Sequence, residues 1–295
     1  MDKRLILGGC SHMWGMGLSH SHTGCPPLFC SHKPSSDIYI HQIAGNDFKI
    51  INASYPGSSN QTINRRVMNV LQSLNSFKDL AVFVQWTAWV RIEMPHNVFE
   101  NVCHDSPYGR LFIEMNRRVS GSKEAQKWSK NLYKEYLSDV YLFQQTLQAI
   151  IMLNRFCAHN GIKIINVLGF DLDFNNSNQL ESYFIGDTKT LNYEYKNLVV
   201  DYATRNYNYL HDCKEKHGTH SYTTNDDNPY DLYTLSMVEQ LQDFNWIDFD
   251  GESYMTFCNN KQFEMTKSFH YKQEAHDYIA KKYSRIIKNE LKLSN

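Results

Sequence analysis

Short, nearly continuous apolar runs recur along the chain, and stretches of helical periodicity separate them. Runs of this kind are typical of parallel β-strands that are covered on both faces. The predicted strands are Leu5–Leu7, Phe48–Asn52, Leu80–Thr87 and Lys163–Leu168. The predicted amphipathic helices are Asn60–Leu74, Leu137–His159 and Lys272–Leu293. Because strands alternate with helices, the pattern predicts an α/β fold in three layers (α/β/α), doubly wound around a mainly parallel sheet.

Two segments, about 94–135 and 171–245, do not follow this alternation. We interpret them as helical insertions in a single domain that covers residues 1–295. The second is rich in Asn, Asp and Tyr, with nine tyrosines from Tyr183 to Tyr233. These tyrosines suit half-buried positions on surface helices. They also suit a lid or a binding face for sugars or a protein partner, and the sequence leaves both open.

Charge and cysteine content narrow the class of protein. The 295 residues carry a formal net charge of −1, which argues against electrostatic binding to nucleic acid or to a membrane surface. No apolar run is long enough to span a bilayer, and the amino terminus lacks the apolar core of a signal peptide. Seven cysteines form no regular framework, which favours reduced thiols and a cytoplasmic setting.

The end of the first strand holds the main candidate for chemistry. Gly8 and Gly9 permit a sharp turn there, and Ser11 follows at the edge of the sheet where ligands bind in open α/β folds. A serine needs a base to act as a nucleophile. His270, at the entrance of the last helix, is the candidate base.

Two further segments end at the same predicted edge. The run from Asn52 to Asn60 contains Gly57 for a tight turn, and its last residues, Ser58 to Asn60, can cap the following helix. After the third strand come Thr87 and Arg91. Arg91 could bind an anionic group of a substrate, or it could form an ion pair with Glu93 that steadies the loop.

In this order, the motifs resemble those of the SGNH (GDSL-like) hydrolases, and especially the compact versions of tailed phages. Gly9-Cys10-Ser11 is similar to the Gly-Asp-Ser block of that family, and Tyr55-Pro56-Gly57 to the block that supplies an oxyanion-hole glycine. The segment that ends in His270 is similar to the last block, Asp-x-x-His. Trp86-Thr87 and Arg91-Ile92-Glu93 match the phage versions. The resemblance implies a flavodoxin-like SGNH hydrolase fold without a cofactor.

The implied reaction is ester hydrolysis through an acyl-enzyme on Ser11, with His270 as the base and the N–H groups of Ser11 and Gly57 in the oxyanion hole. The family's asparagine after the third strand is missing here, and Asn60 or Thr87 is expected to replace it. Lys267 stands where the family has its triad aspartate, and Glu264 or a backbone carbonyl could replace that aspartate in part.

A histidine- and cysteine-rich segment after Ser11 contains residues of the types that bind zinc. The candidate ligands are His20, His22, Cys25, Cys30 and His32. Their spacing matches no familiar zinc finger, and Pro26-Pro27 indicates an irregular loop. We therefore expect a solvated loop near the active site without bound zinc.

Two functions are compatible with these motifs. The first is an esterase or deacetylase that acts on a small-molecule or glycan ester, such as O-acetyl groups on a carbohydrate, alone or as a homo-oligomer. The second is a phage protein that keeps the fold but has a decayed site and serves in binding or in the virion. Lys267 and the Trp86–Trp89 segment favour the second, whereas Ser11, Gly57 and His270 together favour the first.

Overall fold

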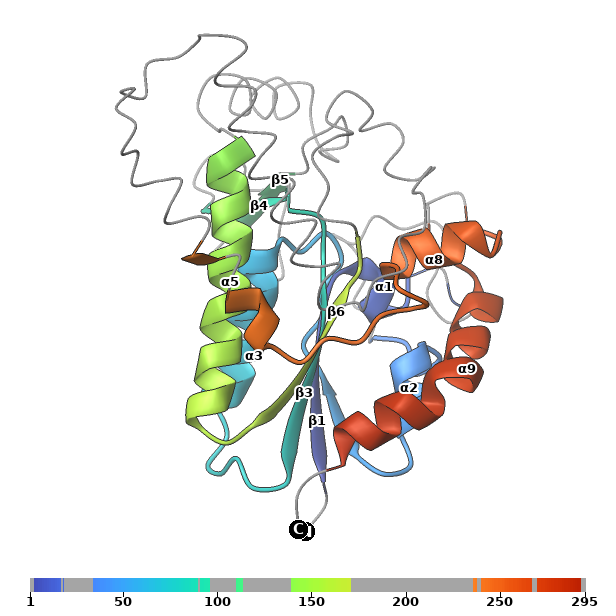
Figure 1. The fold of residues 1–295 in the computed structure, drawn as a ribbon, viewed down its shortest axis with the longest axis horizontal. Coiled ribbons are helices and arrows are strands. Elements are labelled where there is room, and N and C mark those ends of the chain that lie inside the picture. Colours follow the sequence, from blue (N-terminus) through green and yellow to red (C-terminus); the bar gives the residue numbers. More distant parts are fainter. Residues whose placement is uncertain are drawn as a thin grey trace, which may run out of the picture.

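A four-stranded parallel sheet forms the centre of the molecule (Figure 1). The computed structural model describes residues 3–16, 18, 34–89, 91–95, 110–113, 139–170, 236–237, 240–266 and 270–292. The strands are β1 (Arg4–Gly8), β2 (Lys49–Asn52), β3 (Leu80–Trp86) and β6 (Lys163–Leu168), in the order β2-β1-β3-β6. All four predicted strands are therefore confirmed.

The register of the sheet explains why the central strand is apolar along its whole length. β3 pairs with β1 on one side, from Arg4↔Leu80 to Gly8↔Val84, and with β6 on the other. Every residue of β3 is buried. A bridge between Asn166 and Trp246 adds a further chain segment beyond β6. The resulting order is that of a flavodoxin-like sheet.

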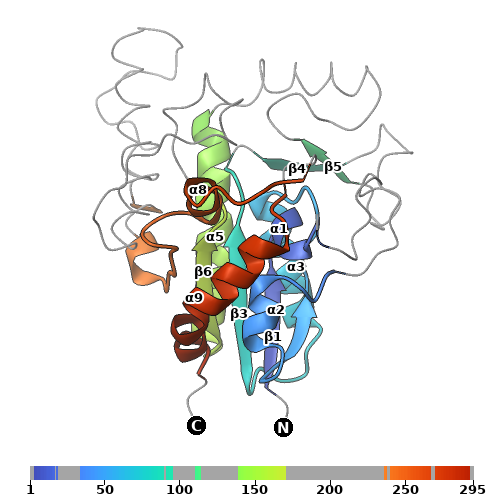
Figure 2. The ribbon, with the colours of Figure 1, turned by 90° about the vertical axis from the view of Figure 1, so that its right-hand side faces the viewer.

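Helices cover both faces of this sheet, as the alternation predicted. α2 (Tyr39–Ala44) packs against α9 (Gln273–Leu291) on one face, and α3 (Asn60–Gln72) packs against α5 (Asp139–His159) on the other (Figures 1 and 2). The three predicted helices exist and begin and end within two residues of the expected positions. The α/β/α layering is confirmed.

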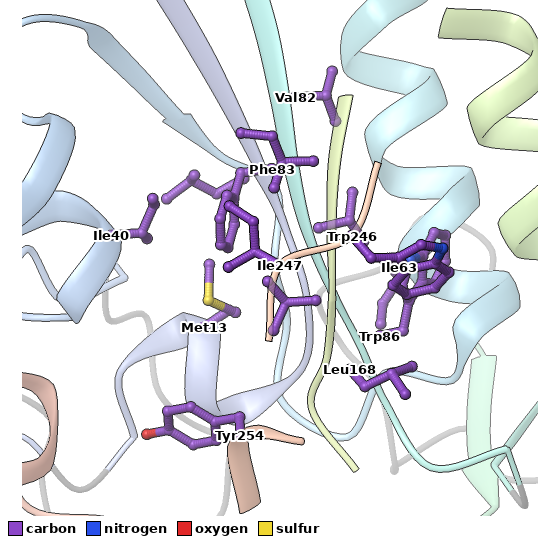
Figure 3. Packing of buried hydrophobic residues seen from close by; sticks show 14 of the residues in the cluster. Met13, Ile40, Ile63, Val82, Phe83, Trp86, Leu168, Trp246, Ile247 and Tyr254 are labelled. Carbon is purple, nitrogen blue, oxygen red and sulfur yellow. The ribbon is translucent and has the colours of Figure 1, made fainter. Parts of the chain in front are cut away.

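The apolar core fills the space between these layers. Phe83, Met13 and Ile40 lie on the side of the sheet that faces α2, and Trp86 lies beside α3 (Figure 3). The indole N–H of Trp86 donates to Asn166 Oδ1 at 2.9 Å, so its one polar atom is satisfied inside the core.

The sequence patterns did not predict several short elements. They are α1 (Ser11–Trp14), α2, the 3-10 turn Leu241–Asp243, α8 (Tyr254–Asn260), and the antiparallel pair of β4 (Ile92–Pro95) with β5 (Arg110–Ile113). β5 lies in the segment 94–135, so the expectation that this insertion is helical is wrong for its described part. A strand of four residues is too short to show a periodicity of its own. Among the described helices, none is long and apolar enough to cross a membrane.

Candidate active site

Ser11 lies where the strand order of the sheet reverses. The chain leaves β1 through α1 and α2 toward β2 on one side, while β3 lies on the other side of β1. In doubly wound sheets this switch point is the place where ligands bind, beyond the carboxyl ends of the strands. Ser11 opens α1 directly after β1 and is 7% exposed. The nucleophile predicted from the sequence is thus located at the expected edge.

Close packing explains the two glycines before Ser11. A Cβ on Gly8 would lie 2.6 Å from Cγ2 of Val67 on α3, and a Cβ on Gly9 would lie 2.5 Å from the side chain of Met13. Both distances are shorter than real Cβ contacts, so only glycine lets β1 meet α3 and turn tightly into α1.

The loop after β2 lies against this turn and carries Gly57 with it. The Tyr55 N–H donates to the carbonyl of Gly9 at 3.1 Å, and Asn52 Nδ2 donates to the carbonyl of Met13 at 3.0 Å. Gly57, two residues after Tyr55, has a φ of +74°, a conformation that favours glycine. Nothing lies within 4 Å of the place where its Cβ would stand, so backbone conformation rather than space requires glycine here.

Asn60 joins the start of α3 to the end of β3. Its Oδ1 accepts from the Thr87 N–H at 2.8 Å, and its Nδ2 donates to the Thr87 carbonyl at 3.0 Å and to Thr146 Oγ1 at 3.1 Å. Both amide hydrogens of this fully buried side chain are thus already donated. In this arrangement Asn60 holds Thr87 in place and has no hydrogen left for an oxyanion. The Thr87 hydroxyl is buried and has no hydrogen-bond partner among the described residues.

We expect Asn60→Ala to lower the free energy of unfolding by about 2–4 kcal/mol, because it leaves the buried N–H and carbonyl of Thr87 without partners. Urea unfolding measures this change. Asn64→Ala is a matched control one turn further along α3, since among the described residues the Asn64 amide donates only to the sulfur of Met152. Equal losses in the two variants would contradict the role of Asn60.

His270 is presented by a narrow hairpin before α9. The Thr266 N–H donates to the carbonyl of His270 at 2.8 Å, and the His270 N–H donates to Thr266 Oγ1 at 3.3 Å. A bridge between Met265 and Tyr271 continues the pairing. His270 is 9% exposed, so its ring lies inside the protein rather than in solvent.

Glu264, considered above as a substitute for the triad aspartate, is engaged elsewhere. Its side chain is 70% exposed and forms an ion pair with Lys272 across the hairpin. An exposed carboxylate of this kind is on the solvent side of the hairpin and stabilises the buried His270 little. Lys267 itself lies outside the described residues.

His12 connects the Ser11 turn to His270. Its ring centroid lies 5.0 Å from that of His270, with an angle of 42° between the planes. Since His12 directly follows Ser11, the two predicted catalytic residues, from opposite ends of the chain, lie in one neighbourhood. Burial and the charge of Arg91 lower the pKa of His12 to about 3, so its ring is neutral near pH 7.

Arg91 also belongs to this neighbourhood. It is 9% exposed, and its guanidinium lies over the ring of Phe170, 5.4 Å from the centroid. This is a cation–π contact at the carboxyl ends of β3 and β6. The side chain of Glu93 lies outside the described residues, so the predicted ion pair with Arg91 stays a prediction.

The candidate zinc ligands, which we expect not to bind zinc, are not part of the described structure. His20, His22, Cys25, Cys30 and His32 all lie outside the described residues. Within the described part of the chain, no group of three or more His, Cys, Asp or Glu side chains is placed to hold a metal ion.

Sequence reasoning missed several residues that shape the site. Asn52 closes β2 and binds the backbone of α1, and neither this contact nor a role for His12 was predicted from the sequence. Phe170 and Tyr254 pack on the His12 ring from two other segments. Only the position of His12 beside Ser11 was a usable signal, because the other contacts depend on how distant segments meet.

Comparison with known proteins gives similarities in structure only. No family model matches the chain, and no curated protein matches it in sequence. The esterase EstA from Pseudoalteromonas sp. has 9% identity and a TM-score of 0.45, over 98% of this chain and 99% of its own.

Two further solved structures are similar in the same way. A member of the lipolytic protein G-D-S-L family from Veillonella parvula has 11% identity and a TM-score of 0.42, over 97% of this chain and 98% of its own. The acetyl xylan esterase AlAXEase has 10% identity and a TM-score of 0.39, over 96% of this chain and 99% of its own.

Proposed function

We propose that this protein is a serine ester hydrolase in which Ser11 is the nucleophile and His270 is the general base. One observation carries the proposal. Ser11 stands at the switch point of a doubly wound sheet, and the ring of its neighbour His12 lies 5.0 Å from the ring of His270. A serine hydroxyl and a buried imidazole that reach this neighbourhood from opposite ends of the chain are the two groups that acyl transfer requires.

In the proposed reaction, Ser11 Oγ attacks the ester carbonyl carbon while its proton passes to a ring nitrogen of His270. The carbonyl oxygen becomes an oxyanion, which accepts hydrogen bonds from the backbone N–H groups of Ser11 and Gly57. When the tetrahedral intermediate collapses, the C–O bond to the alcohol breaks, and the alcohol takes the proton from His270. Water then repeats these steps on the acyl-enzyme and releases the acid.

We propose the Thr87 hydroxyl as a third donor to the oxyanion. Its oxygen is buried and without a partner among the described residues, whereas the Asn60 amide has donated both hydrogens. Each well-placed donor contributes about 3 kcal/mol to transition-state stabilisation.

For the substrate, we propose an O-acyl group on a carbohydrate, which Arg91 and the tyrosine-rich segment 171–245 would help to bind. Aromatic and amide side chains suit the faces and hydroxyls of sugars. We also propose that residues 1–295 form one domain, with insertions at about 94–135 and 171–245.

A fluorophosphonate probe tests the proposed nucleophile, because it phosphonylates only an activated serine. We expect covalent labelling of the purified protein on the peptide that contains Ser11, located by mass spectrometry, and a labelling rate at least about 100-fold lower in His270→Ala. Hydrolysis of p-nitrophenyl acetate and of acetylated xylo-oligosaccharides is measured in parallel. If the folded protein is not labelled and hydrolyses neither ester, the proposed hydrolase function is refuted. The binding or structural role is then favoured.

A further inference from the structure

His12 is enclosed by aromatic rings from separate parts of the chain. Phe170, after β6, meets it edge-on with centroids 5.8 Å apart, and Tyr254, at the start of α8, does so at 5.4 Å. Tyr271 lies at 6.2 Å, and His270 is nearest at 5.0 Å. With 4% exposure and contacts on these sides, the ring of His12 has little freedom to turn.

One nitrogen of this enclosed ring has no hydrogen-bond partner in the described part of the chain. Nδ1 lies 3.9 Å from the sulfur of Cys10, but Nε2 is buried and has no partner among the described residues. A buried polar atom without a partner costs free energy, so its presence calls for an explanation. The tautomer with its proton on Nδ1, facing the sulfur, leaves a lone pair on Nε2.

The groups around His12 keep this ring neutral and therefore able to accept a hydrogen bond. Its titratable and charged neighbours are Cys10, Arg91, Tyr254, His270, Tyr271 and His276. Burial and the charge of Arg91 lower the pKa of His12 to about 3, far below the pH range of ester hydrolysis.

His276 does not compete for His12, because both of its nitrogens are engaged. Its Nδ1 accepts from the backbone N–H of Tyr39 at 3.3 Å, which fixes the proton of the neutral ring on Nε2. That N–H faces the hydroxyl of Tyr254 at 3.5 Å. The Nε2 atom of His12 is thus left for another partner.

We propose that His12 is a positioning residue for His270, accepting a hydrogen bond at Nε2 from the imidazolium that forms when His270 has taken the proton of Ser11. The inference rests on the proposed function. The proton stays on His270 until the leaving alcohol takes it, so His12 orients and stabilises the charged ring without itself being protonated. In a Ser-His-Asp triad a carboxylate does this, and here Lys267 occupies the matching position in the sequence.

The geometry suits this hydrogen bond. Ring centroids 5.0 Å apart make the two imidazoles close neighbours, so the proposal requires only that a nitrogen of His270 and Nε2 of His12 approach to about 3 Å in the reacting complex. Catalytic hydrogen bonds are often long before substrate binds and shorten in the reacting complex.

Kinetics with three variants test the proposal. We expect His12→Phe, which keeps the ring packing but removes the acceptor, to lower kcat about 10- to 100-fold with little change in KM. In the pH profile of kcat/KM for His12→Phe, the acid limb should move to lower pH, because the imidazolium of His270 is no longer stabilised. His12→Gln offers an acceptor oxygen and should recover most of both effects. The control His276→Phe removes another buried imidazole and should leave the limb in place. An unmoved limb in His12→Phe, or no recovery in His12→Gln, would overturn the proposal.

A second measurement does not depend on activity. NMR titration of the histidine rings, with His270→Ala to assign the signal, should show the midpoint of His270 about one pH unit lower in His12→Phe than in the wild type. A moved midpoint supports the contact even in a protein that hydrolyses no ester, and an unmoved midpoint refutes it even in an active enzyme. Thermal unfolding confirms that each variant is folded, and His12→Leu replaces His12→Phe if the larger ring prevents folding.

Discussion

Replacing Ser11 with alanine is expected to lower kcat/KM for an acetyl ester by about 10⁴-fold or more, because the acyl group then has no oxygen on which to be held. The side chain is 7% exposed at the start of α1, and alanine suits a helix, so we expect the fold to be unchanged. Turnover of p-nitrophenyl acetate by wild type and variant, with circular dichroism as the check on folding, measures the effect.

The double variant Ser11→Ala/His270→Ala sharpens this test. Residues that act as one catalytic unit are far from additive, so the double variant should be about as slow as Ser11→Ala alone. Ser73→Ala, at a serine whose hydroxyl donates to the carbonyl of Val70 at the far end of α3, is the control and should keep its activity. Hydrolysis that survives in Ser11→Ala would place the nucleophile elsewhere.

Mild acid is expected to destabilise the protein strongly between pH 6.5 and pH 5. Burial lowers the pKa of both His12 and His276 to about 3, whereas both titrate near 6.5 in the unfolded chain. Below pH 6.5 the unfolded state therefore binds protons that the folded state does not bind. The free energy of unfolding should fall by up to about 1.4 kcal/mol per pH unit for each histidine, and about twice that for the pair. The stabilisation is complete above pH 6.5 and is lost progressively toward pH 3.

Other groups change this slope less. His41 has a pKa lowered by burial and acts in the same direction, whereas the raised pKa of Asp248 acts in the opposite direction. Urea unfolding at pH 7, 6 and 5 measures the slope, and His276→Phe should reduce it by about half. A free energy of unfolding that is constant from pH 7 to pH 5 would contradict the buried, neutral state of these rings.

The strands and long helices were predictable because they carry repeating patterns. β3 is buried along its whole length and β1 and β6 over most of theirs, and α9 has one apolar face toward α2 and the sheet. The cap of α3 was also predictable, since the side chain of Ser59 accepts the N–H of Thr62 within a few residues of sequence. The short α1, α2 and α8 and the β4–β5 pair carry no such repeat, and tertiary contacts decide them.

The site divides in the same way. Ser11, Gly57 and His270 were recognisable because each sits in a short motif at the end of a predicted element, so local sequence determined them as candidates. The role of Asn60 was not predictable, because its amide is used by the backbone of Thr87 and the hydroxyl of Thr146 in other segments. The ion pair between Glu264 and Lys272 at the surface was not predictable from the sequence either.

By itself, then, the sequence determined the layered sheet, the order of its elements and the serine turn after β1, since all of these follow from local periodicity and from glycine at close contacts. Only the tertiary structure decided what surrounds Ser11. His12, Phe170, Tyr254 and His270 come from four distant segments and meet in one buried cluster. Contacts of this kind depend on how the elements pack, and packing is decided by the whole fold rather than by any one segment.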